Sequence, residues 1–132
     1  MFATSLAASE LSESWQEGDG SARWRSAAGH TGATSGSSLL EVDPGNRLPR
    51  HTDSAEELVV VVSGTASVTV AGETSEVPAG GVALVPACVP HEVRNAGGEV
   101  LRFVAVYASN HVTTTYEREV QPAGSLEQDP LG

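Results

Sequence analysis

The sequence contains one cysteine and few basic side chains. With Cys88 alone, no disulfide can form within the chain, and we expect the reducing cytoplasm as its compartment. Only 7 lysine and arginine residues stand against 17 acidic ones, which gives a formal net charge of −10. This charge repels phosphate backbones and anionic membrane surfaces. We therefore expect neither nucleic acid nor a membrane as a partner.

Long apolar runs are missing as well. Runs such as residues 58–62 are far shorter than the roughly 20 residues that a helix needs to cross a bilayer. The first residues lack a basic region followed by an apolar stretch, so no secretory signal is predicted. Repeats of the length found in solenoid proteins are also absent. With 132 residues, 39% of them hydrophobic, the chain is predicted to form a single globular domain.

Short segments rich in β-branched residues fill the middle of the chain. Glycine, proline and Asx residues separate them at intervals of roughly 8 to 12 residues, which is typical of an all-β sandwich or barrel. Residues around Gly72 predict a tight hairpin, and residues 95–99 predict a second, slightly longer one. The expected strands are residues 21–27, 37–43, 57–63, 66–71, 74–78, 81–87, 91–95, 100–107 and 112–117.

The two ends of the chain differ from this middle region. Residues 1–20 are rich in serine, alanine and glutamate without a clean period, and we interpret them as a flexible N-terminal arm. Residues 121–132 combine proline and glycine with few apolar residues, which predicts an irregular C-terminal tail. The barrel itself is expected over residues 21–120.

Side chains that can bind a metal gather in two central stretches. In the first stretch, His51, Asp53 and Glu57 share one parity, so on an extended chain they would leave from the same face. Glu56 has the opposite parity and is expected to point away. In the second stretch, His91 follows a proline, which restricts the backbone before the imidazole. Ligands from both stretches would make one metal site.

The spacing of these residues resembles the two motifs of the cupin superfamily. The first motif is G, five residues, H-x-H, three or four residues, E, six residues, G. Its matches here are Gly45, His51, Glu57 and Gly64. The second motif is G, five residues, P-x-G, two residues, H, three residues, N, and a longer insert precedes the histidine here. Its matches are Gly72, Pro78, Gly80, His91 and Asn95.

The resemblance implies an antiparallel double-stranded β-helix, the cupin jelly-roll barrel, which pairs as a homodimer. It also implies a divalent transition metal, Fe, Mn, Ni or Zn, held by His51, Asp53, Glu57 and His91. Asp53 replaces the second histidine of the motif, and two readings of it stay open. If it binds, two imidazoles and two carboxylates neutralise the ion without selecting sharply among these metals. If it does not, the other three form the two-His, one-carboxylate set of non-haem Fe(II) oxygenases.

The function implied by the resemblance is a metal-dependent, dioxygenase-like enzyme acting on a small organic molecule inside the barrel. The alternatives are a non-catalytic cupin that binds or senses a small ligand, and a cupin isomerase, lyase or cyclase.

Other residues are assigned to structural roles or to the pocket. Arg47, Arg50, Arg94 and Arg102 could orient an anionic substrate or balance the acidic surface. Trp24, Phe103 and Tyr107 could line a pocket or fill the core. We interpret His30 and His111 as exposed turn residues, and Cys88 as a small buried group.

Overall fold

The computed structural model describes the backbone of residues 1–132 and the side chains of residues 1–18 and 21–132. Over these residues the chain forms twelve strands and one short 3-10 helix, η1 (Leu6–Ala8). None of the described helices is long and apolar enough to span a membrane. In chain order the strands are β1 (Ser12–Gln16), β2 (Asp19–Thr31), β3 (Gly36–Val42), β4 (Arg47–Asp53), β5 (Glu57–Ser63), β6 (Thr65–Val70), β7 (Glu73–Pro78), β8 (Val82–Val85), β9 (His91–Asn95), β10 (Leu101–Tyr107), β11 (Thr114–Val120) and β12 (Ser125–Gln128).

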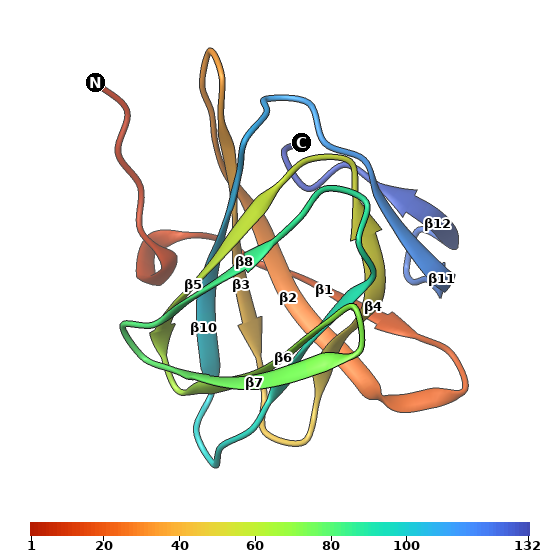
Figure 1. Ribbon diagram of the computed structural model, residues 1–132. Coiled ribbons are helices and arrows are strands. Elements are labelled where there is room, and N and C mark those ends of the chain that lie inside the picture. The colour runs from red at the N-terminus through yellow and green to blue at the C-terminus, as the bar shows by residue number, and fades with distance from the viewer.

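The strands pair into two six-stranded antiparallel sheets (Figure 1). The first sheet has the order β1-β2-β3-β10-β5-β8, and the second has the order β12-β11-β4-β9-β6-β7. Strands that follow one another along the chain often lie in different sheets, as β3 and β4, β4 and β5, and β9 and β10 do. Repeated crossing between two facing sheets is the arrangement of a jelly roll. The predicted all-β, antiparallel jelly-roll fold is confirmed.

Alternate side chains of the facing strands fill the space between the two sheets. Along β10, Leu101, Phe103 and Ala105 are fully or almost fully buried, as the period of two in an extended strand requires. Val59 of β5 and Val93 of β9 meet them from neighbouring and opposite strands in the same core. Burial of each large apolar side chain stabilises the fold by about 1.5–3 kcal/mol.

Only one of the two predicted hairpins forms in the structure. Ala71 and Gly72 join β6 to β7 with φ values of 51° and 83°, which is the positive-φ pair that a tight two-residue turn needs. The first hairpin is therefore confirmed. The second prediction is wrong, because β9 and β10 belong to different sheets. The Asn95 amide donates hydrogen bonds to the carbonyl oxygens of Val42 and Glu99, and these bonds hold the chain where it changes sheet.

Three strands were not expected from the sequence. β4 contains Pro49, which lacks the N–H that a strand interior uses, and its pairing with β9 shifts register between Leu48 and His51. This irregularity accommodates the proline. The other two strands, β1 and β12, lie outside residues 21–120 and pair with β2 and β11. The division of the chain into arm, barrel and tail at these boundaries stays a prediction.

Candidate metal centre

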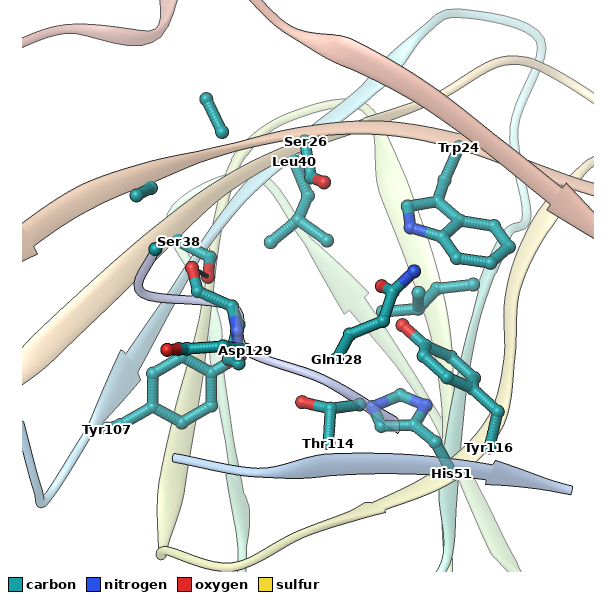
Figure 2. Close-up of a pocket in the computed structure, with 15 residues that line it drawn as sticks. Trp24, Ser26, Ser38, Leu40, His51, Tyr107, Thr114, Tyr116, Gln128 and Asp129 are labelled. Carbon is teal, nitrogen blue, oxygen red and sulfur yellow. Dashed lines mark hydrogen bonds between the residues drawn. The ribbon is translucent and has the colours of Figure 1, made fainter. Parts of the chain in front are cut away.

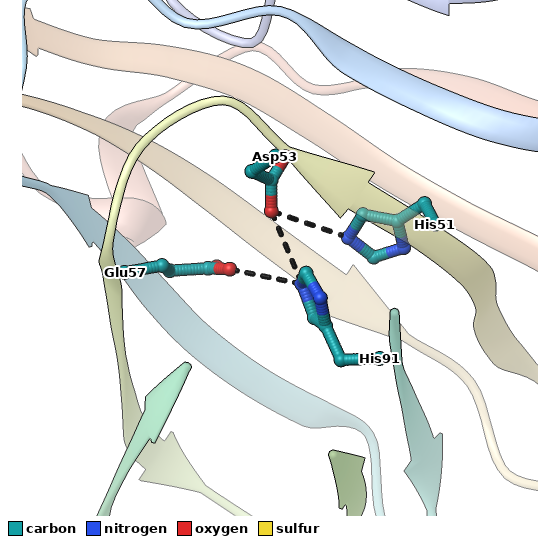
Figure 3. Close-up of side chains that lie close together, drawn as sticks. All are labelled: His51, Asp53, Glu57 and His91. Atoms are coloured by element: carbon teal, nitrogen blue, oxygen red, sulfur yellow. Dashed lines mark hydrogen bonds and ion pairs between the residues drawn. The ribbon is translucent and has the colours of Figure 1, made fainter. Parts of the chain in front are cut away.

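Four side chains that can bind a metal meet between the two sheets (Figure 3). His51 and Asp53 come from β4, and His91 comes from the neighbouring strand β9, directly opposite His51. Glu57 is the first residue of β5, which belongs to the other sheet. Shared parity places His51 and Asp53 on the same buried face of β4, but it does not bring Glu57 to them. Glu57 joins them because the chain turns from one sheet into the other between Asp53 and Glu57.

The distances within this group are those of neighbouring ligands around one ion. The His91 Nε2 atom lies 3.1 Å from Glu57 Oε1 and 3.1 Å from Asp53 Oδ2, while His51 Nε2 lies 3.5 Å from the same Asp53 oxygen. One ligand atom from each of the four residues lies within 4.8 Å of the others. Ligands at right angles with bonds of about 2.1 Å are separated by about 3.0 Å.

Backbone carbonyls orient both imidazoles. His51 Nδ1 lies 2.6 Å from the carbonyl oxygen of Pro49, and His91 Nδ1 lies 2.9 Å from that of Val89. A carbonyl oxygen can only accept a hydrogen bond, so each Nδ1 carries the proton and donates it. In the neutral ring, Nε2 then directs its lone pair into the group, which is the arrangement of a histidine prepared to bind a metal.

Asp53 is the residue whose bonding the protein leaves incomplete. Its side chain is buried, and its Oδ1 atom accepts a hydrogen bond of 2.6 Å from the Thr114 hydroxyl. Its Oδ2 atom has no hydrogen-bond partner, although both imidazoles approach it at ion-pair distance. A buried carboxylate oxygen that accepts no hydrogen bond is costly. A cation among the four residues would satisfy it, so this donor set fits a divalent metal.

Burial and mutual contact shift the pKa values within the group. For Glu57, burial outweighs the contact with His91 and raises the pKa of the carboxyl. For Asp53, burial acts in the same direction, but the contacts with His51 and His91 are stronger and hold its pKa well below the ordinary value. Burial lowers the pKa of His91, but its contacts with Asp53 and Glu57 have the larger combined effect and raise this pKa to about 10. Without a metal, the group therefore keeps a proton on His91.

A cavity of about 250 Å³ reaches this group at His51, and Thr114, which donates to Asp53, also lines it (Figure 2). Its walls come from β2, β3, β4, β10, β11 and the last residues of the chain. Tyr116 packs against the His51 ring with 5.2 Å between centroids, and Trp24 packs against Tyr116 at 5.6 Å. Burial raises the pKa of the Tyr116 phenol, so it stays protonated near neutral pH. The four-residue group thus borders a space large enough for a small molecule.

The remaining candidate residues lie on the cavity wall, in the core or at the surface. Trp24 and Tyr107 line the cavity, whereas Phe103 lies in the core. Glu56 is exposed and points away, and His111 is exposed in a loop, as expected.

Two expectations were wrong. His30 lies in β2 and its Nδ1 atom bonds to the Ser37 hydroxyl at 2.7 Å, because β2 extends farther than the turn-like sequence indicated. Cys88 is exposed rather than buried, in a turn with a positive φ of 63°.

The sequence did not indicate several of the residues that line the cavity. Thr114 and Tyr116 have the same parity in a strand that was expected, so their common face was readable, but nothing indicated that this face meets His51. Gln128 lies in the segment interpreted as an irregular tail. No local signal marked it, because its position depends on the pairing of β12 with β11.

Comparison with known proteins gives this fold and site a family. A family model described as the cupin domain matches residues 38–107, which is more than half of the chain. This chain belongs to the cupin family. The match includes all four residues of the candidate metal centre. A search of the curated proteins found no match.

Solved structures of other cupins share the architecture. The cupin domain of Cnp3 from Schizosaccharomyces pombe has a TM-score of 0.68 at 20% identity, covering 81% of this chain and 73% of its own. A conserved protein of unknown function from Streptococcus pyogenes has a TM-score of 0.58 at 24% identity, covering 65% of this chain and 74% of its own. These two likenesses concern the fold alone.

Oxalate decarboxylase from Bacillus subtilis is also similar to this cupin. Its S161A mutant has a TM-score of 0.63 at 26% identity, and the alignment covers 76% of this chain. The alignment covers only 29% of the decarboxylase chain. Another structure of the same enzyme, with 26% identity and a TM-score of 0.59, concerns its Mn(II) centres and covers 74% of this chain and 28% of its own.

Proposed function

We propose that this cupin binds one divalent transition metal through His51, Asp53, Glu57 and His91. The observation that carries the proposal is the buried Asp53 Oδ2 atom, which lacks a hydrogen-bond partner and faces the Nε2 atoms of both imidazoles. This atom also favours the reading in which Asp53 is a ligand. Two carboxylates and two neutral imidazoles then balance the charge of a divalent ion.

The donor set is compatible with Fe, Mn, Ni or Zn, because mixed imidazole and carboxylate ligands do not select sharply among them. The likeness to an oxalate decarboxylase with Mn(II) centres supports testing manganese first. The identity of the native metal is thus an experimental question that the ligand types narrow to these four ions.

We further propose that the site is that of a metal-dependent, dioxygenase-like enzyme acting on a small organic molecule in the barrel. A bound Fe or Mn ion would supply Lewis acidity and redox chemistry beside the cavity. The protein supplies the surroundings. Thr114 fixes the Asp53 carboxylate, and Tyr116 and Trp24 form an aromatic wall next to His51. All four proposed ligands are buried.

A second candidate is a cupin that binds or senses a small ligand without turnover. Among the described residues that line the cavity, the ionisable ones other than His51 are Tyr107, Tyr116 and Asp129. Burial raises the pKa of both phenols, so neither accepts a proton near neutral pH. Asp129 is then the one carboxylate on the described wall that could accept a proton, and it does not belong to the metal-ligand group. So few candidates for acid–base chemistry favour binding without turnover, or an isomerisation, elimination or cyclisation for which a bound metal would supply Lewis acidity.

The metal proposal is tested by elemental analysis of protein purified without a metal-affinity tag. We expect about one transition-metal ion per chain, and at least a several-fold loss in His51→Ala and His91→Ala. Glu56→Ala is the matched control, since this exposed carboxylate neighbours Glu57 but points away. Equal metal content in all three variants would contradict the ligand assignment. Oxygen uptake by the loaded protein, with a panel of small organic molecules, then separates an oxygenase from a binding protein.

We also propose that the cupin is a homodimer, with the reducing cytoplasm still the predicted compartment. The outer face of β5 and β8 exposes Leu58, Val62, Val82 and Leu84, with exposed fractions of 40%, 52%, 60% and 56%. The two strands are hydrogen-bonded neighbours, so these side chains form one apolar surface. A contiguous apolar surface on a sheet is typical of a protein–protein contact.

A further inference from the structure

We infer that the cavity beside the metal centre accepts an uncharged small molecule with hydrogen-bonding groups and excludes anions of the oxalate type. The inference rests on the proposed function, because it names the substrate class of that same site. It follows from where the positive side chains lie, from the charge around the cavity, and from the groups that point into it.

The arginines of the chain lie away from the cavity. The chain contains no lysine. Among the side chains that the structure describes, none of the seven arginines lines the cavity. Each has a partner elsewhere, which is an acidic side chain in five cases, a backbone carbonyl in one and a hydroxyl in one. The pairs are Arg23 with Glu13, Arg25 with Asp43, Arg50 with Glu117, Arg94 with Glu92, Arg102 with Glu41, Arg118 with Glu17, and Arg47 with Ser21.

The groups around the cavity are together neutral or negatively charged. A divalent ion with Asp53 and Glu57 as ligands has no net charge left to attract an anion. Asp129, near the end of the chain, lines the opposite wall and contributes a carboxylate. The chain as a whole has a formal net charge of −10. An anion entering this cavity would lose its hydration without gaining a counter-charge. An uncharged molecule avoids that cost.

The groups that point into the cavity suit a neutral ligand. Figure 2 shows the Gln128 amide and the Tyr116 hydroxyl directed into the space beside Trp24. Within the described part of the chain, these two polar groups make no side-chain hydrogen bond, so both are free to bond with a ligand. An amide offers two donors and one acceptor, and a phenol offers one of each. Together they match hydroxyl or amide groups, while Trp24 and Leu40 supply apolar surface.

The size of the cavity limits the ligand further. A volume of about 250 Å³ is below the range of about 300–1,000 Å³ that pockets for drug-sized molecules span. The expected occupant is therefore about the size of one substituted six-membered ring. Benzamide and benzoate form a suitable pair of probes, because they have nearly the same shape and differ by one charge.

Trp24 provides the signal for the binding experiment. The chain has two tryptophans, so Trp15→Phe leaves Trp24, on the cavity wall, as the only indole. Fluorescence titrations are run on this variant in its metal-free and Mn(II)-loaded forms. We expect benzamide to bind at least tenfold more tightly than benzoate in both forms. The metal-free form matters because there benzoate cannot bind by ligating the metal.

A charge placed in the cavity provides the converse test. Gln128→Arg, in the same background, should raise the affinity for benzoate at least tenfold and weaken the binding of benzamide. Leu126→Arg is the matched control, because it adds the same charge to β12 at an exposed position that does not line the cavity. This control should leave the preference for benzamide unchanged.

The outcomes separate this inference from the metal proposal. Tighter or equal binding of benzoate, binding of neither probe, or an equal gain of benzoate affinity in both arginine variants would overturn the inference. Preference for benzamide in a protein that elemental analysis finds unable to hold a metal would instead overturn the proposed function alone. A metal-loaded protein that prefers benzoate would leave the metal centre in place and remove its proposed substrate class.

Discussion

Metal binding to this cupin should release a proton, with His91 as its source. Contacts with Asp53 and Glu57 raise the pKa of His91 to about 10, so at pH 7 the metal-free protein carries this proton on Nε2, the atom that has to bind the ion. The metal and the proton compete for one lone pair. The apparent affinity for the metal should therefore rise with pH and level off above about pH 10.

The size of the effect follows from the competition. For one proton, the apparent association constant changes tenfold per pH unit below the pKa, which is about 1.4 kcal/mol. Between pH 7.0 and 8.5 the affinity for Mn(II) should thus increase by about 30-fold. Calorimetric titrations in two buffers of different ionisation enthalpy should report about one proton released per metal bound. Glu56→Gln, which changes an exposed carboxylate beside Glu57, should leave that number unchanged.

The metal-free protein should show the opposite dependence in its stability. The pKa of His91 lies above its ordinary value of 6.5, so the proton stabilises the folded state fully below about pH 6.5. This stabilisation is lost as the pH rises through about 10. Melting temperatures of the metal-free protein should fall over this range more than those of the metal-loaded protein. An affinity that does not change with pH, together with no proton release, would refute the reasoning.

Three further predictions concern the residues around the metal, the outer surface and the core. Thr114→Val removes the hydrogen bond to Asp53 Oδ1 and should weaken metal binding about 10- to 100-fold in a chelator competition, while Thr114→Ser should retain it. Leu84→Glu should convert the proposed dimer to a monomer in analytical ultracentrifugation, and Leu126→Glu, exposed on another strand, should not; a Leu84→Glu protein that is dimeric would place the interface elsewhere. Phe103→Ala should lower the free energy of unfolding by about 3–5 kcal/mol in urea denaturation, because this fully buried side chain leaves a cavity; a loss below about 1 kcal/mol would contradict its place in the core.

The fold could be predicted from the sequence because its signals are local. Most strands were readable from β-branched segments between glycine and proline residues, and the motif spacing around His51 and His91 indicated the barrel. Local signals did not predict strands whose formation depends on pairing with a neighbouring strand. β4 contains a proline that pairing with β9 tolerates at a register shift, and β12 exists only because β11 offers it an edge. The glycines after Asn95 suggested a hairpin, but they form a crossing between sheets.

The sequence by itself determined which residue types could hold a metal and how they are spaced along the chain. It also determined the charge of −10 and the absence of lysine, because composition does not depend on folding. Only the tertiary structure decided that Glu57 reaches the group from the opposite sheet, that Asp53 keeps a buried oxygen without a hydrogen-bond partner, and that Gln128 lines the cavity. These features depend on the register between strands that are distant in sequence, and a shift of one residue would turn each side chain to the other face.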